Sequence, residues 1–131
     1  MSGESYADSH RAVRMGLFEK SIDELRTAYV YPQENGNRSG VHWLDLTSAG
    51  SMLHINGDQP FQFAARRWTT EQLEAASHTS ELEPGDRVWL NLDLGQTGLG
   101  SASCGPGVLP AHRLVAAPAS FILRFHVREP N

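Results

Sequence analysis

The fold class is decided by residues 87–94, which read Arg-Val-Trp-Leu-Asn-Leu-Asp-Leu. Every second residue is apolar and the residues between them are mostly polar. This alternation is typical of a β-strand, because neighbouring side chains of a strand point to opposite faces of the sheet. Trp89 stands on the otherwise polar side, so both faces of the strand are partly apolar. We therefore expect a central strand, or one whose second face meets a partner.

The same alternation recurs in residues 121–128, which read Phe-Ile-Leu-Arg-Phe-His-Val-Arg. In residues 60–65, Phe61 and Phe63 share one face while Gln62 and Ala64 share the other, which predicts a half-buried strand. Shorter β-prone runs predict further strands at residues 27–31, 41–46, 52–56 and 112–116. Turn residues punctuate them, with a hairpin turn expected at Gly50-Ser51 and a second turn at Gly57-Asp58.

One helix is expected, at residues 69–76. Thr69 is a suitable N-cap, and Gln72, three residues later, can complete a capping box. About seven short strands and one brief helix predict a mainly β protein, an antiparallel β-sandwich with one short helix.

Length and charge narrow the function classes. The chain has 131 residues, eleven basic and fifteen acidic side chains and a formal net charge of −4. Nucleic-acid binding is not expected, since phosphate neutralisation needs clustered lysine and arginine. Residues 1–10 lack the apolar core of a signal peptide, and no apolar run approaches the roughly 20 residues that span a bilayer. We expect a cytoplasmic protein with no membrane partner.

Residues that could bind a metal, a cofactor or a sugar are scattered along the chain. Cys104 is the single cysteine, which excludes an internal disulfide, and the six histidines do not have metal-ligand spacing. Gly98-Leu99-Gly100 lacks the third glycine of a dinucleotide fingerprint. We expect no metal and no cofactor. Three tryptophans could stack on sugar rings or pack in the core: Trp43, Trp68 and Trp89.

Several segments together carry a family resemblance. Residues 29–38 read Tyr-Val-Tyr-Pro-Gln-Glu-Asn-Gly-Asn-Arg, which resembles the Y-V-x-P-x-E-N-G-x-R stretch of glycoside hydrolase family 2 β-galactosidases. Further segments match the family in the same order along the chain. One precedes this stretch, at residues 3–8, and the others follow it, at residues 60–63, 70–78, 88–93, 98–100 and 103–106. The resemblance therefore covers nearly the whole sequence.

The resemblance implies a fold and a division of labour. In that family the matching region is the C-terminal portion of a galactose-mutarotase-like β-sandwich, at the end of the chain or of a small subunit. The catalytic glutamates and the active-site metal ligands lie in other parts of the polypeptide. We therefore expect no catalytic residue here, and divide the chain into an N-terminal arm (1–26) and a sandwich portion (27–131). The implied partners are the remainder of the β-galactosidase chain, or a large subunit, and a galactoside such as lactose.

The resemblance also implies one substrate-binding position. In enterobacterial relatives a loop after the W-L-N-x-D strand brings a tryptophan to the mouth of the active site. Here Cys104 stands at that position, so Ser103, Cys104 and Gly105 are the implied substrate-binding residues. A thiol has no ring face, so the stacking contact would be lost or replaced.

Two other functions remain open from the residues alone. One is a stand-alone carbohydrate-binding module, supported by the tryptophans. The other is a small mutarotase-type enzyme, which needs a histidine and a carboxylate around a sugar ring. Its candidates are His54, His78 or His126 with Glu34 or Asp93. A portion of a larger sandwich would leave an apolar sheet face uncovered, so we also expect self-association or binding to the missing part.

Overall fold

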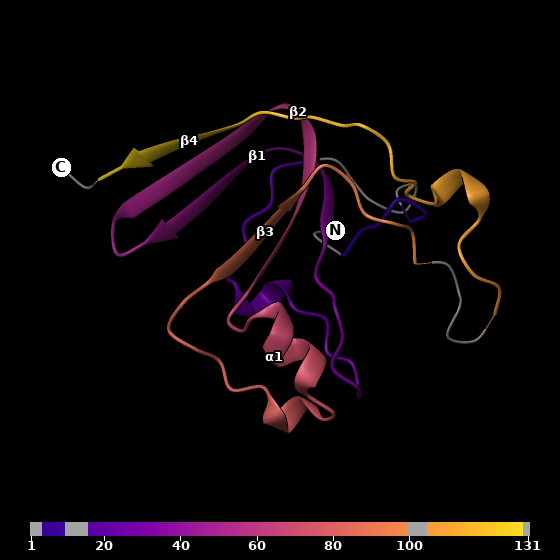
Figure 1. The fold of residues 1–131 in the computed structure, drawn as a ribbon. Coiled ribbons are helices and arrows are strands. Elements are labelled where there is room, and N and C mark those ends of the chain that lie inside the picture. Colours follow the sequence, from indigo (N-terminus) through magenta and orange to yellow (C-terminus); the bar gives the residue numbers. More distant parts are fainter. Residues whose placement is uncertain (1–3, 10–15, 100–104, 130–131) are drawn as a thin grey trace.

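The structure is a computed structural model that describes residues 4–9, 16–99 and 105–129. Its centre is one antiparallel sheet of four strands: β1 (Arg38–Ser48), β2 (Ser51–Arg66), β3 (Trp89–Asp93) and β4 (Leu123–Arg128). Helical turns lie outside the sheet: α1 (Thr70–Ala75), η2 (Asp23–Leu25), η3 (Thr79–Glu81) and η4 (Pro110–His112). The predicted fold class, mainly antiparallel β with one short α-helix, is confirmed. The four strands form a single open sheet (Figure 1).

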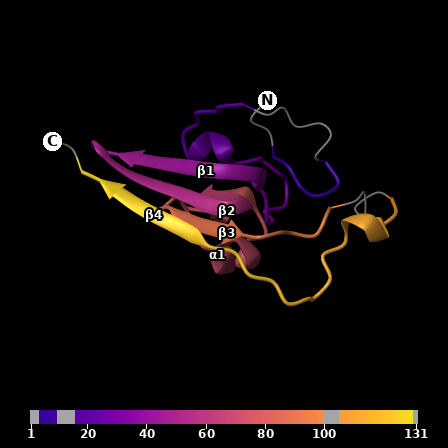
Figure 2. The ribbon, with the colours of Figure 1, turned by 90° about the horizontal axis from the view of Figure 1, so that it is seen from above.

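Strand β2 is the spine of the sheet. β1 pairs along one side of it. On the other side, β3 pairs with residues 62–66 of β2, while β4 pairs with residues 52–57. Both β3 and β4 run antiparallel to β2 and follow one another along the same edge of it, as one row of the sheet. Figure 2 shows β4 on the side of β2 away from β1. The intervening residues, 94–122, leave this row and return to it, and we call them the excursion loop.

The β1–β2 hairpin turns one residue earlier than expected. Ser48 pairs with Ser51, so the turn residues are Ala49 and Gly50, with φ of 47° and 87°. Positive φ at both positions is the geometry of a type I′ turn, which matches the natural twist of the paired strands. The predicted hairpin is therefore confirmed, with its turn at 49–50.

A predicted turn at Gly57-Asp58 is wrong, because β2 continues through it. Successive register pairs are Val41↔Phe61 and Trp43↔Asn56, so β2 carries extra residues opposite β1 and forms a bulge there. A Cβ on Gly57 would collide with the carbonyl oxygen of Gln59, so the bulge needs a glycine. The glycine-aspartate pair thus bends one long strand and does not separate two short ones.

Two predicted strands are absent from the described sheet. Residues 27–31 do not pair with it. The Thr27 and Tyr29 hydroxyl groups instead donate to Glu4, and the Thr27 N–H donates to the Asn35 side chain. Residues 112–116 are likewise outside the sheet, beginning at the end of η4. Strands β3 and β4 also begin two residues later than the alternation predicted.

The predicted half-burial of residues 60–65 is wrong as well. Phe61 and Phe63 lie in the core, but Gln62 and Ala64 on the opposite face are buried too. Asn37 covers that face and donates from Nδ2 to Gln62 Oε1 at 2.8 Å and to the Ser5 carbonyl oxygen at 2.8 Å. The second face of this strand is therefore buried by Asn37, a residue from another part of the chain. The alternation of residues within one strand cannot predict such a contact.

The core is concentrated at one end of the sheet. Its buried apolar residues are Leu25, Ile55, Phe61, Phe63 and Ala65, and η2 supplies Leu25. At the margin of this core, Phe125 and Val127 of β4 pair with Ile55 and Leu53, so they share the core face. Their side chains nevertheless remain 55 % and 70 % exposed. We call this region the open apolar face, formed by Leu44, Leu46, Leu53, Phe125 and Val127.

The capping box of α1 is confirmed. The Gln72 N–H donates to Thr69 Oγ1 at 3.1 Å, and the Thr69 N–H donates to Gln72 Oε1 at 2.9 Å. These reciprocal bonds satisfy two backbone donors that the first helical turn would leave without partners. Leu73 is the buried residue of this helix, with 3 % of its surface exposed.

Candidate functional site

The excursion loop is tied to the sheet where it leaves and where it returns. At its start, Gln96 Nε2 donates to Asp93 Oδ2 at 3.0 Å. At its end, the Asp58 N–H donates to the Ile122 carbonyl oxygen at 3.1 Å, and the Ile122 N–H donates to Asp58 Oδ1 at 3.0 Å. The Asp58 side of this anchor belongs to the bulge of β2, so the bulge has a direct role in fixing the loop.

Within the loop, its two arms are joined near the base. The Gly98 N–H donates to the His112 carbonyl oxygen at 3.0 Å, which connects the outgoing arm to η4 on the returning arm. The Asp8 carboxylate lies against the same point, since a Cβ on Gly98 would lie 2.8 Å from Asp8 Cγ. The N-terminal segment and both arms of the loop therefore meet at Gly98, where a side chain would have to displace the Asp8 carboxylate.

The implied substrate-binding residues fall within the sequence of this loop. Ser103 and Cys104 lie outside the described residues, and Gly105 is described as an exposed bend. On the outgoing arm the last described residue, Leu99, is 52 % exposed. The loop is thus anchored at its base, and the described residues that precede and follow residues 100–104 are exposed.

The carboxylates singled out from the sequence are not brought together with the candidate histidines. Arg66 Nη1 donates to Glu34 Oε2 at 2.8 Å, and the Arg66 side chain is 7 % exposed. Glu34 is thus the counterion of a buried arginine. Asp93 accepts from Gln96, as above. In the described ranges neither carboxylate meets a histidine, so this part of the chain provides no geometric support for mutarotase-type chemistry.

The candidate histidines pair with other carboxylates. His54 Nδ1 lies 2.6 Å from Asp45 Oδ1, and His78 Nδ1 lies 3.0 Å from Glu81 Oε1. His126 lies beside His54, with 6.2 Å between ring centroids. The part of the chain that the structure describes contains no group of three or more His, Cys, Asp or Glu side chains placed to hold a metal ion.

The tryptophans divide into one buried and two half-exposed side chains. Trp68 is 5 % exposed and belongs to the core, whereas Trp43 and Trp89 are 46 % and 43 % exposed. The Trp43 ring stacks on His54 with 6.0 Å between centroids and 29° between planes. Trp43 therefore presents an aromatic ring on the sheet face opposite the open apolar face.

Comparison with known proteins identifies the family. A sequence model described as "Beta galactosidase small chain" matches residues 2–125. The chain belongs to this β-galactosidase small-chain family. The match covers β1, β2, β3, the first three residues of β4 and the whole excursion loop. It includes the two predicted substrate-binding residues that lie outside the described ranges.

Complete enzymes contain relatives of this small-chain segment. The β-galactosidase of Actinobacillus pleuropneumoniae is 34 % identical over 122 residues, which are 93 % of this chain. Those of Arthrobacter sp. (strain B7) and Kluyveromyces lactis are each 35 % identical, over 127 and 122 residues. The chain spans only 12 % of the length of each of these relatives. Among its described residues, no helix is long and apolar enough to cross a membrane.

Sequence reasoning missed one organising residue of the small-chain segment, Glu4. Its carboxylate accepts hydrogen bonds from the Tyr6, Thr27 and Tyr29 hydroxyl groups and from the Gly36 N–H. Burial raises the pKa of the Glu4 carboxyl group, but these hydrogen bonds outweigh burial and hold its pKa below the usual value. Burial together with Glu4 raises the pKa of Tyr6.

The only sequence signal for this cluster was indirect. Glu4 and residues 29–38 both lie in segments that carry the family resemblance, but no local pattern connects them. In the structure the two segments are joined directly by hydrogen bonds. The Glu4 carboxylate accepts from Gly36 of the turn and from the Thr27 and Tyr29 hydroxyl groups. Glu4 thereby helps to place the same N-terminal segment whose Asp8 lies against Gly98 of the loop.

Proposed function

We propose that this chain is the C-terminal portion of a β-galactosidase, which completes the sandwich fold and holds a loop at the rim of the active site. The catalytic glutamates would come from the remainder of the enzyme, which hydrolyses terminal β-D-galactosides such as lactose. Two facts support this division. The family match covers nearly the whole chain, and the chain corresponds to 12 % of each complete relative described above.

The rim role rests on one observation, the position of the excursion loop. β3 and β4 occupy the same row of the sheet, so the loop between them projects from the sheet and returns to it. Its base is held by Asp58–Ile122 and by Gly98–His112. Anchoring the two ends of a loop restricts the conformations open to the residues between them, which favours substrate binding. We assign substrate contact to Ser103, Cys104 and Gly105.

Cys104 gives this rim a distinct chemistry. A tryptophan at this position would stack its ring on the apolar face of a sugar, whereas a thiol offers only a small, weakly polar contact. The contact with the part of the substrate beyond galactose would therefore be weaker than in relatives with the aromatic residue. The expected effect is on substrate affinity, because the reacting bond is handled elsewhere.

The open apolar face supports a large partner. Phe125 and Val127 share the core face yet remain more than half exposed, while the polar side of β4 faces away. Sheets in sandwiches bury such faces against a second sheet about 10 Å away. We propose that the remainder of the β-galactosidase covers this face in the cytoplasm, and that the isolated chain uses it for homo-oligomer formation. The division into an arm (1–26) and a sandwich portion (27–131) belongs to the same proposal.

Complementation tests the proposal. The chain is mixed with the Actinobacillus pleuropneumoniae enzyme lacking the region that this chain matches, and hydrolysis of a chromogenic β-galactoside is followed. We expect no turnover by either part alone and measurable turnover by the mixture. A Phe125→Asp/Val127→Asp variant should abolish complementation, while His126→Asp, on the opposite face of β4, should retain it. Turnover by the chain alone would contradict the proposal.

A second experiment addresses the rim. In the complemented enzyme, Cys104→Trp should lower KM for lactose several-fold and leave kcat nearly unchanged, because stacking adds binding that is the same in ground and transition states. Cys104→Ser serves as the control without a ring. Equal KM values for both variants would remove Cys104 from the substrate-binding site.

A carbohydrate-binding module is the second candidate, favoured by the half-exposed Trp43. Cross-strand pairing places Asn56 and Arg124 in the same row as Trp43, so a ring and two polar side chains share one flat face. This is the combination that holds sugars on β-sheets, a stacking ring beside hydrogen-bonding groups. Saturable tryptophan fluorescence changes with millimolar galactose, lost in Trp43→Ala, would favour this function over fold completion.

A further inference from the structure

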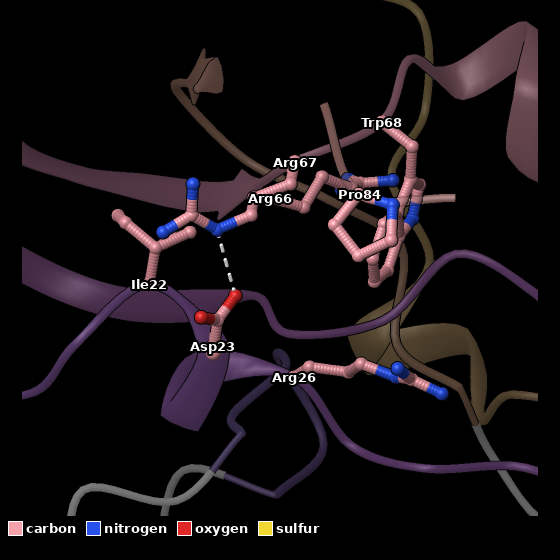
Figure 3. A pocket seen from close by; sticks show the side chains of 7 residues that line it. All are labelled: Ile22, Asp23, Arg26, Arg66, Arg67, Trp68 and Pro84. Carbon is pink, nitrogen blue, oxygen red and sulfur yellow. Dashed lines mark hydrogen bonds and ion pairs between the residues drawn. The ribbon is translucent and has the colours of Figure 1, made fainter. Parts of the chain in front are cut away.

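A pocket of about 220 Å³ lies between η2 and the end of β2, away from the excursion loop in sequence (Figure 3). It is lined by Ile22, Asp23, Arg26, Arg66, Arg67, Trp68 and Pro84. Three of these seven residues are arginines, in a chain whose formal net charge is −4. A concentration of guanidinium groups around a hollow is the usual setting for binding an oxygen anion.

Two of the arginines already have counterions. Arg66 donates to Glu34, and Arg67 Nε donates to Asp23 Oδ1 at 2.9 Å (Figure 3). Arg26 has no ion pair within the described ranges, and its guanidinium carbon lies 5.2 Å from the centroid of the Trp68 ring. The three arginines of the pocket therefore have two carboxylate partners, Asp23 in the lining and Glu34 outside it. The positive charge of Arg26 is left without a carboxylate.

The Trp68 indole, which contacts Arg26, carries a polar group without a hydrogen-bond partner in the described part of the chain. Trp68 Nε1 is buried, and it has no hydrogen-bond acceptor within the part of the chain that the structure describes. A buried indole N–H normally has an acceptor, because losing its water without replacement is unfavourable. The unmet donor and the unpaired charge belong to two side chains in direct contact. One negatively charged oxygen acceptor would satisfy both.

We propose that this pocket binds a carboxylate group. A carboxylate supplies the negative charge that Arg26 lacks and an acceptor lone pair for Trp68 Nε1. The pocket is smaller than the range of about 300–1,000 Å³ typical of ligand sites for larger molecules, so it suits a single acidic group better than a sugar. The carboxylate can be a free small acid, or an aspartate or glutamate side chain from the remainder of the enzyme. The site itself does not depend on the proposed function.

Trp68 gives a direct signal for the test. The three tryptophans give three indole N–H resonances in a ¹⁵N-correlated NMR spectrum, and Trp68→Phe identifies the one that belongs to the pocket. Sodium acetate is titrated against sodium chloride at constant ionic strength and pH 7. We expect a saturable shift of the Trp68 resonance in the millimolar range of acetate, with the Trp43 and Trp89 resonances unmoved. A shift that is linear, or equal in chloride, would overturn the proposal.

Variants of Arg26 establish which charge is responsible. Arg26→Gln should weaken acetate binding at least tenfold, while Arg26→Lys, which keeps the charge, should retain it within about threefold. Arg87→Gln removes an exposed arginine outside the pocket and should leave binding unchanged. Should Arg26→Gln fail to fold, the titration of the unsubstituted chain still decides, because a Trp68 resonance that shifts no more in acetate than in chloride would contradict the proposal.

A final arm separates the two sources of the carboxylate. The titration is repeated on the chain after assembly with the truncated Actinobacillus enzyme. Loss of the acetate response in the assembly assigns the site to an acidic side chain of the remainder, and persistence assigns it to a free acid. If acetate binds the chain but no assembly forms, the proposed function fails while the pocket assignment stands.

Discussion

The Glu4 carboxylate accepts a hydrogen bond at 3.0 Å from the backbone N–H of Gly36, which lies 32 residues further along the chain. The same carboxylate oxygen also accepts from the Tyr6 hydroxyl at 2.7 Å. Gly36 has φ of 82°, and a Cβ there would lie 3.1 Å from the Leu25 carbonyl oxygen. One carboxylate thus joins the N-terminal segment to a turn that accepts only glycine without strain.

The first prediction concerns acid stability through Glu4. Its pKa in the folded protein lies below the usual 4.5, so the ionised form stabilises the fold above about pH 4.5 and this contribution is lost as the pH falls. Glu4→Gln should lower the free energy of unfolding by about 1–3 kcal/mol at pH 7. The difference between the two proteins should shrink towards about pH 3. Urea denaturation across this pH range measures both.

Glu74→Gln is the matched control, since Glu74 is an exposed carboxylate on α1. It should change the free energy of unfolding by no more than about 0.5 kcal/mol at pH 7. A Glu4→Gln effect that stays constant from pH 7 to about pH 3 would show that the charge of Glu4 does not matter.

The second prediction concerns the capping box. Thr69→Ala removes the acceptor for the Gln72 N–H and should destabilise the protein by about 1 kcal/mol in urea denaturation. Thr70→Ala, one residue later and exposed, replaces a poorer helix former by alanine and should be neutral or slightly stabilising. If the two substitutions had equal effects, the hydrogen bond to Thr69 would not contribute to stability.

The third prediction concerns the hairpin turn. Ala49 has positive φ, where a residue with a Cβ is disfavoured, but asparagine tolerates this region and Asn-Gly is the preferred type I′ pair. Ala49→Asn should raise the free energy of unfolding by about 0.5–1 kcal/mol. Ala49→Val should lower it, because a β-branched residue fits this conformation poorly. Thermal unfolding of both variants gives the sign, and a common sign would disprove the argument.

The fourth prediction concerns the open apolar face. Burying a phenylalanine side chain contributes about 1.5–3 kcal/mol, so Phe125→Lys should weaken self-association of the isolated chain at least tenfold. Sedimentation velocity at tens of micromolar would show the shift towards monomer. His126→Lys places the same charge on the other face of β4 and should leave association unchanged. A monomeric parent chain at this concentration would remove the basis for homo-oligomer formation.

Local signals in the sequence predicted the elements that depend on adjacent residues. The alternation in residues 87–94 and 121–128 found β3 and β4, and the Thr69–Gln72 spacing found the capping box. The errors arose where distant residues intervene. Residues 27–31 are held by Glu4, and Gln62 is covered by Asn37. No pattern within either stretch encodes those contacts.

The candidate sites followed the same rule. Ser103, Cys104 and Gly105 were assigned through family resemblance, because nothing in their own spacing indicates sugar binding. The arginine pocket was missed altogether, since its lining comes from residues 22–26, 66–68 and Pro84. Only folding brings these separate segments together, and only the folded arrangement reveals which arginine lacks a counterion.

The excursion loop has a consequence for how this enzyme family can diversify. Both ends of the loop are held against β2, so the distance between them is set by β2 and not by the number of residues in the loop. Loop-closure entropy grows only logarithmically, and doubling the loop would cost roughly 0.6 kcal/mol. Insertions and deletions in the loop can therefore change its length and composition while every strand keeps its register, so the proposed substrate contact can vary without a change of fold.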